Sequence, residues 1–366
     1  MRERVLVAMS GGVDSSVAAA LLVEEGYDVV GATMKLFCYG DDVPDRPCCS
    51  LDSINDARRV CQQLGVPHYV LNLEGAFGRD VIDNFVQEYA RGRTPIPCVR
   101  CNTFTKFRDL LHKADAIDAQ WIATGHYARI VDGALYRGLD PRKDQSYFLW
   151  GIDRDVVRRM LLPVGGRTKA ETRAVAHRLG LAVIAEKTES QDICFVPDGD
   201  HTKILRKHLG ADAPSLNPGP LLLSNGNRVG THDGFAHFTI GQRRGLPGGF
   251  REPMYVVDIR ADERAVVIGP REELLGRGVI GRELNWLTDP PAVGARVSVQ
   301  VRHRAAATAA EIVRLTPNEV ELALDEPVAA ITAGQSLVVY DGSCVLGGGI
   351  IEGSRHSRTP LPILAA

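Results

Sequence analysis

The first half of the chain alternates short apolar runs with stretches in which apolar residues recur every three or four positions. The short runs predict buried strands, and the longer periodic stretches predict helices. The expected strands cover residues 5–9, 27–37, 67–73 and 121–124. The expected helices cover residues 14–25, 54–64, 77–89, 104–113, 154–161 and 169–179. Strands separated by helices predict an α/β domain whose parallel sheet is covered on both faces.

The pattern changes near residue 211. Residues 213–220 are rich in proline and turn formers, which indicates a domain boundary. Beyond them, short strand patterns at 254–259, at 265–268 and repeatedly within 293–351 predict a small barrel or sandwich. We therefore expect a catalytic domain over residues 1–210, a small central domain over 211–280 and a C-terminal domain over 281–366.

Composition narrows the class of protein. Charged residues make up 24% and apolar residues 45% of the 366 residues, as in ordinary globular proteins, and the net charge is −2. Any nucleic-acid binding must therefore come from local basic patches. No early apolar run is long enough for a signal peptide or a membrane span, so we expect a cytoplasmic protein. Eight cysteines in a chain of this length predict thiols rather than a disulfide framework.

The sharpest chemical signal is the string Ser10-Gly11-Gly12-Val13-Asp14-Ser15-Ser16, which follows the first strand and opens the first helix. Backbone N–H groups at a helix N-terminus, together with the helix dipole, favour a bound anion. The lysine of a Walker loop is missing, so the geometry is not that of a kinase or GTPase. A bare Gly-Gly turn would be structural, but the whole string in this place predicts a phosphate-binding loop.

This string resembles the pyrophosphatase loop of enzymes that split ATP into AMP and pyrophosphate, among them argininosuccinate synthetase, GMP synthetase and tRNA thiolases. The loop alone does not choose among them. The other motifs are Thr94–Asn102 with Cys98 and Cys101, Glu189–Phe195 with Cys194, Ala123–Tyr127, Lys143–Leu149, Gly334-Gln335 and Leu346–Ile351. In their order along the chain they resemble the tRNA-specific 2-thiouridylase family over nearly the whole chain. The prolines of the first motif favour an extended loop at the sheet edge.

The resemblance implies an adenine nucleotide α-hydrolase-like domain, a small β-rich central domain and a C-terminal β-barrel. It also implies a reaction in which ATP, with Mg²⁺, adenylates O2 of a wobble uridine before sulfur displaces AMP. The implied partners are tRNA and a protein that donates persulfide sulfur. We expect no membrane partner and a monomer or weak oligomer.

The resemblance also assigns roles residue by residue. Cys101 is the implied nucleophile, and Cys194 accepts the persulfide. Either Cys101 releases that sulfur and the two cysteines form a disulfide, or the sulfur passes directly to the base. The implied ATP-binding residues are Ala8, Met9, Ser10, Gly11, Gly12, Val13, Asp14, Ser15, Met34 and Gly125. The implied tRNA-binding residues are His126, Lys143, Asp144, Gln145, Arg302, His303 and Gln335; where His303 stands the family has tyrosine, so stacking there is weaker.

One position departs from the family pattern. Many members have aspartate where this chain has Cys98, which puts the role of that aspartate in doubt here. Cys98, Cys101 and Cys194 offer three thiolates, so an iron–sulfur cluster is an alternative route for sulfur. We favour the persulfide route because it needs only two cysteines and no metal. Cys38, Cys61 and Cys344 are expected to be small hydrophobic residues, and Cys48-Cys49 a loop feature.

Two rival functions remain at this point. One is a ligase of the same superfamily that acts on a small molecule, and the other is an RNA-binding module that senses adenine nucleotides without turnover. Neither explains Cys101 and Cys194. Basic residues gather within 91–113, 154–178 and 203–208 and at Arg243-Arg244 in a glycine-rich loop, which favours contact with a phosphate backbone.

Overall fold

The computed structural model describes residues 2–37, 51–181, 193–196 and 198–355. The chain forms two compact units. Unit 1 comprises residues 1–82, 97–199 and 343–345, and unit 2 comprises residues 83–96, 200–342 and 346–366. Cys38, Cys48, Cys49 and residues 189–192 of the Cys194 motif lie outside the described residues.

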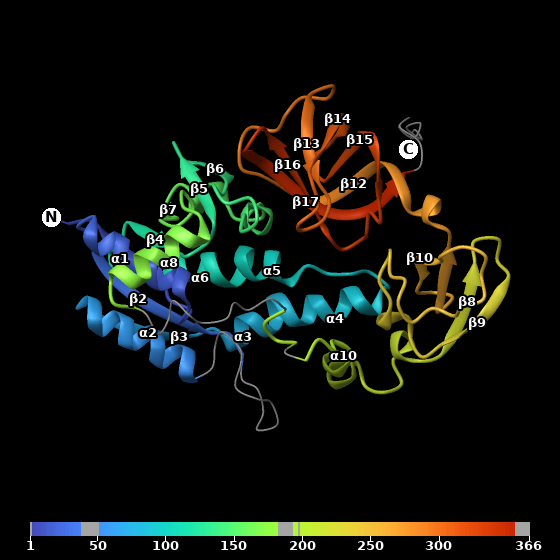
Figure 1. The fold of residues 1–366 in the computed structure, drawn as a ribbon, viewed down its shortest axis with the longest axis horizontal. Helices are drawn as coiled ribbons and strands as arrows, with labels where there is room; N and C mark the ends of the chain where they lie inside the picture. The colour runs from blue at the N-terminus through green and yellow to red at the C-terminus, as the bar shows by residue number, and fades with distance from the viewer. Residues whose placement is uncertain (1, 38–50, 182–192, 197, 356–366) are drawn as a thin grey trace. The chain divides into compact units, whose positions relative to one another are not determined.

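Unit 1 contains a five-stranded parallel sheet in the order β3-β2-β1-β4-β7 (Figure 1). Its strands are β1 (Arg4–Ala8), β2 (Asp28–Lys35), β3 (His68–Asn72), β4 (Trp121–Ala123) and β7 (Met160–Leu161). The central strand β1 has Val5 in register with Val29 of β2 and with Trp121 of β4. This sheet confirms the predicted α/β class. In such sheets ligands bind beyond the carboxyl ends of the strands.

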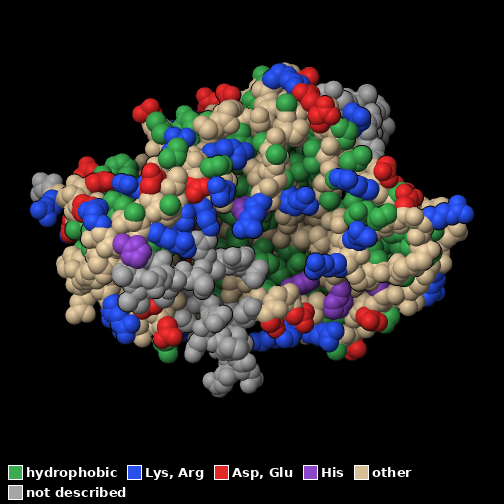
Figure 2. Space-filling view, in the orientation of Figure 1, with side chains coloured by type: hydrophobic (Ala, Val, Ile, Leu, Met, Phe, Trp, Pro, Cys, Tyr) green, Lys and Arg blue, Asp and Glu red, His purple; other side chains and the backbone are tan. Residues whose placement is uncertain are grey.

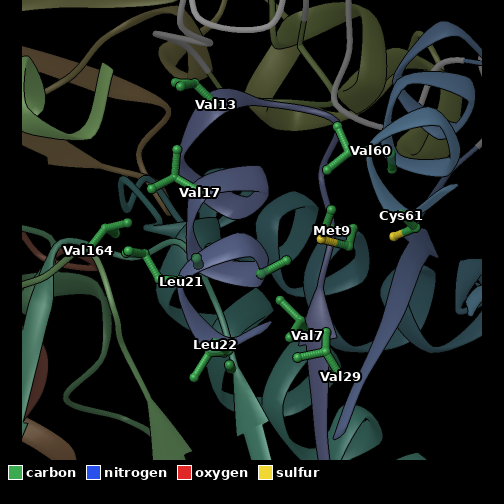
Figure 3. Close-up of a cluster of buried hydrophobic side chains, with 14 of the residues drawn as sticks. Val7, Met9, Val13, Val17, Leu21, Leu22, Val29, Val60, Cys61 and Val164 are labelled. Atoms are coloured by element: carbon green, nitrogen blue, oxygen red, sulfur yellow. The ribbon is translucent and has the colours of Figure 1, made fainter. Parts of the chain in front are cut away.

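The helical elements of unit 1 are α1 (Val13–Glu24), α2 (Leu51–Leu64), α3 (Glu74–Phe77), η1 (Gly78–Ile82), α5 (Pro97–Arg100), η2 (Cys101–Lys106), α6 (Phe107–Asp115), η3 (Ser146–Phe148), α7 (Arg154–Val157) and α8 (Lys169–Arg178). Of these, α1, α2 and α6 contact strands of this sheet, and α8 packs on α1. In the core, Val17 and Leu21 of α1 lie beside Val164, and Met9 lies near Cys61 (Figure 3). Burial of each such large side chain contributes about 1.5–3 kcal/mol. This packing fixes the start of α1 against the end of β1.

Cys61 behaves as the sequence predicts. It belongs to this apolar cluster, and burial raises the pKa of its thiol to about 11. A thiol with such a pKa stays protonated at neutral pH, so the prediction of a small hydrophobic role for Cys61 is confirmed.

The segment that carries Cys98 and Cys101 is helical. The elements α5, η2 and α6 follow one another without a break from Pro97 to Asp115, with a π-helical segment over Cys101–Lys106. The predicted extended loop over residues 94–102 is therefore wrong from Pro97 onward. Proline suits the first position of a helix, because its φ is already helical and its missing N–H is not needed there.

Two other predictions need correction. The helix expected over 154–161 ends at Val157, and Met160 instead pairs with Ile122 of the sheet, where it is buried. A hairpin of β5 (Ala128–Val131) and β6 (Ala134–Arg137) was not expected at all. Its turn is Asp132-Gly133, and both residues have positive φ, as a tight hairpin turn requires.

Unit 2 begins with α4 (Asp83–Ala90) and, after the chain has passed through unit 1, continues with α10 (Thr202–Leu209). A four-stranded sheet follows in the order β10-β11-β8-β9, around a core that includes Phe235. Its elements are η4 (Pro214–Leu216), β8 (Gly219–Leu223), β9 (Arg228–His232), η5 (Phe235–His237), β10 (Tyr255–Arg260), β11 (Ala265–Gly269) and η6 (Arg271–Leu274). This sheet confirms the expected β-rich central part.

The last part of unit 2 is a closed antiparallel barrel. Its six strands run in the order β12-β15-β14-β13-β16-β17, and β12 also pairs with β17, which closes the barrel. They are β12 (Leu275–Trp286), β13 (Arg296–Gln300), β14 (Thr308–Leu315), β15 (Glu319–Ala329), β16 (Ser336–Asp341) and β17 (Cys344–Arg355). Closure leaves no open edge among these strands, so the barrel is stable against edge-to-edge pairing. The predicted C-terminal β-barrel is confirmed.

Within the part of the chain that the structure describes, no helix combines the length and the apolar character that crossing a membrane requires.

Candidate functional site

The phosphate-binding loop predicted from the sequence lies at the carboxyl end of β1. Gly11 has a φ of +71°, and a side chain there would overlap the carbonyl oxygen of Ser53 in α2. The Ser15 hydroxyl accepts from the Ser10 N–H at 3.1 Å and lies 3.1 Å from the Ser10 hydroxyl. Ser15 is buried, whereas Ser10 is exposed. The buried Ser15 hydroxyl thus holds both the backbone and the side chain of Ser10 in the loop.

Asp14, in the first turn of α1, forms an ion pair that the sequence did not predict. The Lys169 Nζ lies 2.7 and 2.9 Å from its two carboxylate oxygens, and the Tyr127 hydroxyl donates to one of them at 2.8 Å. Lys169 is only 8% exposed. A buried ammonium group therefore stands beside the loop, although the loop has no lysine of its own.

Lys169 and Tyr127 are functional candidates that our sequence analysis missed. Lys169 is the first residue of α8, directly after the Thr168 cap, which forms a capping box with Glu171. A cation in the first turn opposes the helix dipole. A lysine directly behind a Thr-x-x-Glu cap is thus an anomaly that points to an anionic partner, and this signal was available in the sequence.

Gly125 brings a third segment to the loop. A Cβ atom on Gly125 would lie 2.5 Å from both the carbonyl carbon of Asp14 and the backbone nitrogen of Ser15. The backbone after β4 therefore lies directly on the start of α1. The structure thus places Gly125 next to the loop, as its predicted role in ATP binding requires. Met34 lies near the carboxyl end of β2, half-buried.

His126 follows Gly125 and links the loop to the helix of the cysteines. Its Nδ1 lies 2.8 Å from the Thr124 hydroxyl, and its ring centre lies 5.8 Å from that of Phe107, at the start of α6. Burial, with a smaller contribution from the charge of Lys106, lowers the pKa of His126 to about 3. The imidazole is therefore neutral at physiological pH, and it can stack or share hydrogen bonds without carrying charge.

The three candidate cysteines differ in exposure. Cys101 is 5% exposed, Cys194 is partly exposed and Cys98 is exposed. Cys101 opens the π-helical segment, a geometry that occurs often at functional sites. The next residue, Asn102, donates through Nδ2 to the Phe148 carbonyl at 3.1 Å, while its buried Oδ1 has no hydrogen-bond partner. This bond ties the cysteine helix to the Lys143–Leu149 motif.

Basic residues of the 91–113 patch lie close to Cys101 in sequence. The Arg100 guanidinium lies over the Phe104 ring at 4.7 Å, and Arg108 pairs with Asp80 at 3.0 Å. Among the residues that the structure describes, which include Cys98, Cys101 and Cys194, no three His, Cys, Asp or Glu side chains are grouped so that they could hold a metal ion.

Several residues predicted to contact tRNA use their polar atoms within the chain. Asp144 accepts from the Gly138 and Ser146 N–H groups, the Ser146 hydroxyl and Arg137. The Gln145 side-chain oxygen accepts from the Tyr127 N–H at 2.8 Å. Lys143 lies in the same turn. These contacts make the motif an internal brace, and its role toward tRNA stays a prediction.

The remaining predicted tRNA residues lie in unit 2. Arg302 is exposed and His303 partly exposed, in the segment after β13. Gln335 donates through Nε2 to two backbone carbonyls of residues 94 and 95. Figure 2 shows Lys and Arg side chains spread over the drawn faces of both units. Arg243, in the glycine-rich loop before β10, is exposed.

Three family models match the chain: a tRNA methyl transferase HUP domain over residues 3–198, a tRNA methyl transferase PRC-barrel domain over 203–270 and an aminomethyltransferase beta-barrel domain over 276–351. The tRNA-specific 2-thiouridylase MnmA of Carboxydothermus hydrogenoformans is 46% identical over 362 residues, covering 96% of this chain and 98% of that protein. The chain belongs to the tRNA-specific 2-thiouridylase family.

Other members of the 2-thiouridylase family match equally well. The MnmA protein of Geotalea uraniireducens is 45% identical, covering 98% of this chain and 97% of its own length. Among solved structures, a 4-thiouridine synthetase–RNA complex with bound ATP covers 58% of this chain and 51% of that chain, at 18% identity and a TM-score of 0.35. The assignment to the family depends on the relatives and not on this weak structural likeness.

Proposed function

We propose that this member of the family is an ATP-dependent tRNA sulfurtransferase that replaces O2 of a wobble uridine by sulfur. The observation that carries the proposal is the loop at Ser10–Ser15, which is closed by Gly125 and by the Asp14–Lys169 ion pair. It lies in the same unit as Cys101 and Cys194. A ligase for small molecules has no need of these two cysteines.

ATP occupies the loop through its phosphates. The backbone N–H groups of the first turn of α1 and the Ser10 hydroxyl are the donors, with residues 8–15, Met34 and Gly125 as the predicted contacts. The Asp14 carboxylate is a suitable ligand for Mg²⁺, which prefers carboxylate and phosphate oxygens. When bound there, the ion would neutralise phosphate charge. Lys169 provides positive charge beside the loop.

In the first step, uracil O2 attacks the α-phosphorus of ATP and pyrophosphate leaves. The O2-adenylated base then has AMP as a good leaving group at C2. We expect His126, next to Gly125, to contact the base as a neutral ring, because burial lowers its pKa to about 3. The uridine must leave its stack to reach the loop, as in other enzymes that modify bases.

In the second step, sulfur arrives as a persulfide on Cys194, whose partial exposure suits transfer from a donor protein. The Cys101 thiolate attacks the Cys194 sulfur, which forms a disulfide and releases hydrosulfide. Hydrosulfide attacks C2, and AMP departs with the former O2. An external thiol must then reduce the disulfide. In the alternative, the terminal persulfide sulfur attacks C2 directly and AMP departs. The Cys101 thiolate then attacks the sulfur of Cys194, which breaks the S–S bond, releases the 2-thiouridine and forms the same disulfide.

Mass spectrometry of tRNA nucleosides tests the proposal. The protein is incubated with tRNA, ATP, Mg²⁺ and a persulfide donor, and 2-thiouridine and pyrophosphate are measured in parallel. We expect both products with the unmodified chain, and pyrophosphate without 2-thiouridine from Cys101→Ser. Pyrophosphate release that does not depend on tRNA would support the small-molecule ligase instead. Binding of ATP and tRNA without pyrophosphate release would support the nucleotide-sensing module.

A further inference from the structure

The chain that enters the cysteine helix is fastened to the C-terminal barrel. Within unit 2, the Thr94 N–H donates to the Ala333 carbonyl at 2.9 Å. Gln335 Nε2 donates to the Thr94 carbonyl at 2.9 Å and to the Pro95 carbonyl at 3.2 Å. One side-chain amide thus holds two successive peptide groups just before Cys98.

Arg93 adds a second attachment. Its guanidinium lies 2.7 Å from Glu88 of α4 and 2.8 Å from Glu352 of β17, and it donates to the Ile351 carbonyl at 3.2 Å. The Arg93 side chain is 19% exposed, so these contacts are partly shielded from water. Fork-shaped guanidinium contacts of this kind fix orientation as well as distance.

The barrel is shaped to receive this segment. Gly334 has a φ of +90°, and a Cβ atom there would lie 2.8 Å from the Thr94 carbonyl oxygen. Its N–H donates to the Ile351 carbonyl, and the Ile351 N–H donates to the Gln335 carbonyl. The turn that presents Gln335 is therefore itself fixed to β17.

We propose that Arg93 and Gln335 are positioning residues, which hold the entry to the Cys98–Cys101 helix on the C-terminal barrel. Pro95 and Pro97 lie between the attachment and the helix, and each fixes its own φ. An attachment at the Pro95 carbonyl therefore limits where the first turn of α5 can lie. The proposal rests on the proposed function, in which Cys101 is the nucleophile. It gives Gln335 a role within the chain in place of the predicted contact with tRNA.

Gln335→Glu is the test variant, because it keeps the size of the side chain but replaces the donor with a carboxylate facing two carbonyl oxygens. The control is Arg282→Met, which removes an exposed ion pair with Glu319 elsewhere on the barrel. Three quantities are measured for each variant: the kinetics of thiolation, the hydrogen exchange of the amides of residues 94–101, and the rate of Cys101 alkylation.

For Gln335→Glu we expect kcat for thiolation to fall about tenfold or more, because small displacements of a nucleophile are costly. KM for tRNA should stay unchanged, while amide exchange over 94–101 and alkylation of Cys101 become faster. If KM for tRNA rises and neither exchange nor alkylation changes, Gln335 is a tRNA contact and the proposal is overturned. Unchanged values throughout would also overturn it.

A milder variant keeps the proposal testable if Gln335→Glu does not fold. Glu352→Gln keeps the shape of the Arg93 partner but removes its charge, and it should speed amide exchange over 94–101 in the same direction. Cys101→Ser distinguishes a failure of the proposed function from a failure of the proposed positioning role. If it still forms 2-thiouridine, the proposed role of Cys101 fails, yet hydrogen exchange still decides whether Gln335 and Arg93 hold the segment.

Discussion

Replacement of Lys169 by methionine tests whether the ion pair with Asp14 organises the phosphate loop. The Lys169 side chain is 9% exposed and that of Asp14 is 31% exposed. Removing one partner of a buried pair costs about 3–5 kcal/mol, whereas an exposed pair contributes at most about 1 kcal/mol. Because water reaches Asp14, we expect Lys169→Met to lower the free energy of unfolding by about 2–3 kcal/mol.

The same substitution should impair the first chemical step. If ATP binds as proposed, Lys169 places positive charge beside its phosphates, and removing one preorganised electrostatic contact of this kind lowers kcat by about 100-fold or more. The assay is tRNA-dependent pyrophosphate release, together with urea titration of each variant. Asp14→Asn and the double variant complete a double-mutant cycle. If the two residues act as a unit, the double variant is no worse than the poorer single variant.

One outcome would refute the catalytic role of the Asp14–Lys169 pair, and another would refute its contribution to stability. If Lys169→Met is destabilised as expected but releases pyrophosphate at the normal kcat/KM, the ion pair is only structural. If the free energy of unfolding is also unchanged, the pair itself contributes nothing. Arg282→Met, which removes an exposed pair in the barrel, should leave both quantities unchanged and controls for the general loss of a cation.

Four further predictions concern sulfur, charge and protons. Cys194→Ser should release pyrophosphate with tRNA but form no 2-thiouridine from a persulfide donor; normal thiolation would exclude its role. Cys98→Ala should keep most activity if the persulfide route operates, whereas an inactive, iron-containing brown protein that loses its colour in this variant would favour the cluster. Arg243→Ala should weaken tRNA binding and flatten the slope of log K against log salt by about one unit, and an unchanged slope would exclude a phosphate contact. Because the folded pKa of His126 is below its unfolded value, stability falls with decreasing pH below about 6.5, by at most about 1.4 kcal/mol per pH unit, and His126→Phe should reduce that slope in urea titrations.

The sequence predicted the strand, the turn and the helix of the Ser10–Ser16 loop well, for a local reason. A strand, a glycine turn and a helix start are adjacent in the chain, so their geometry follows from nearby residues such as Gly11, whose φ of +71° suits glycine. The β5–β6 hairpin was missed although its Asp132-Gly133 turn is a strong local signal. The helix predicted to reach residue 161 failed because Met160 gains a place in the sheet beside Ile122, a contact far away in sequence.

The segment before Cys98 shows why the start of the cysteine helix could not be predicted from the local sequence pattern. Two prolines favour an extended chain, yet Pro97 also satisfies the first position of a helix, and local chemistry does not choose between these outcomes. Gln335, which lies 241 positions from Thr94 in sequence, donates to the carbonyls of Thr94 and Pro95, and α5 begins at Pro97. We infer that this distant contact decides between the two outcomes. Lys169 is similar, since its ion pair with the distant Asp14 explains a cation at a helix start. Before Cys98 the local sequence leaves the structure undecided, and at Lys169 it conflicts with the structure. In both cases a tertiary contact far away in sequence accounts for the outcome, and both positions lie at the proposed site.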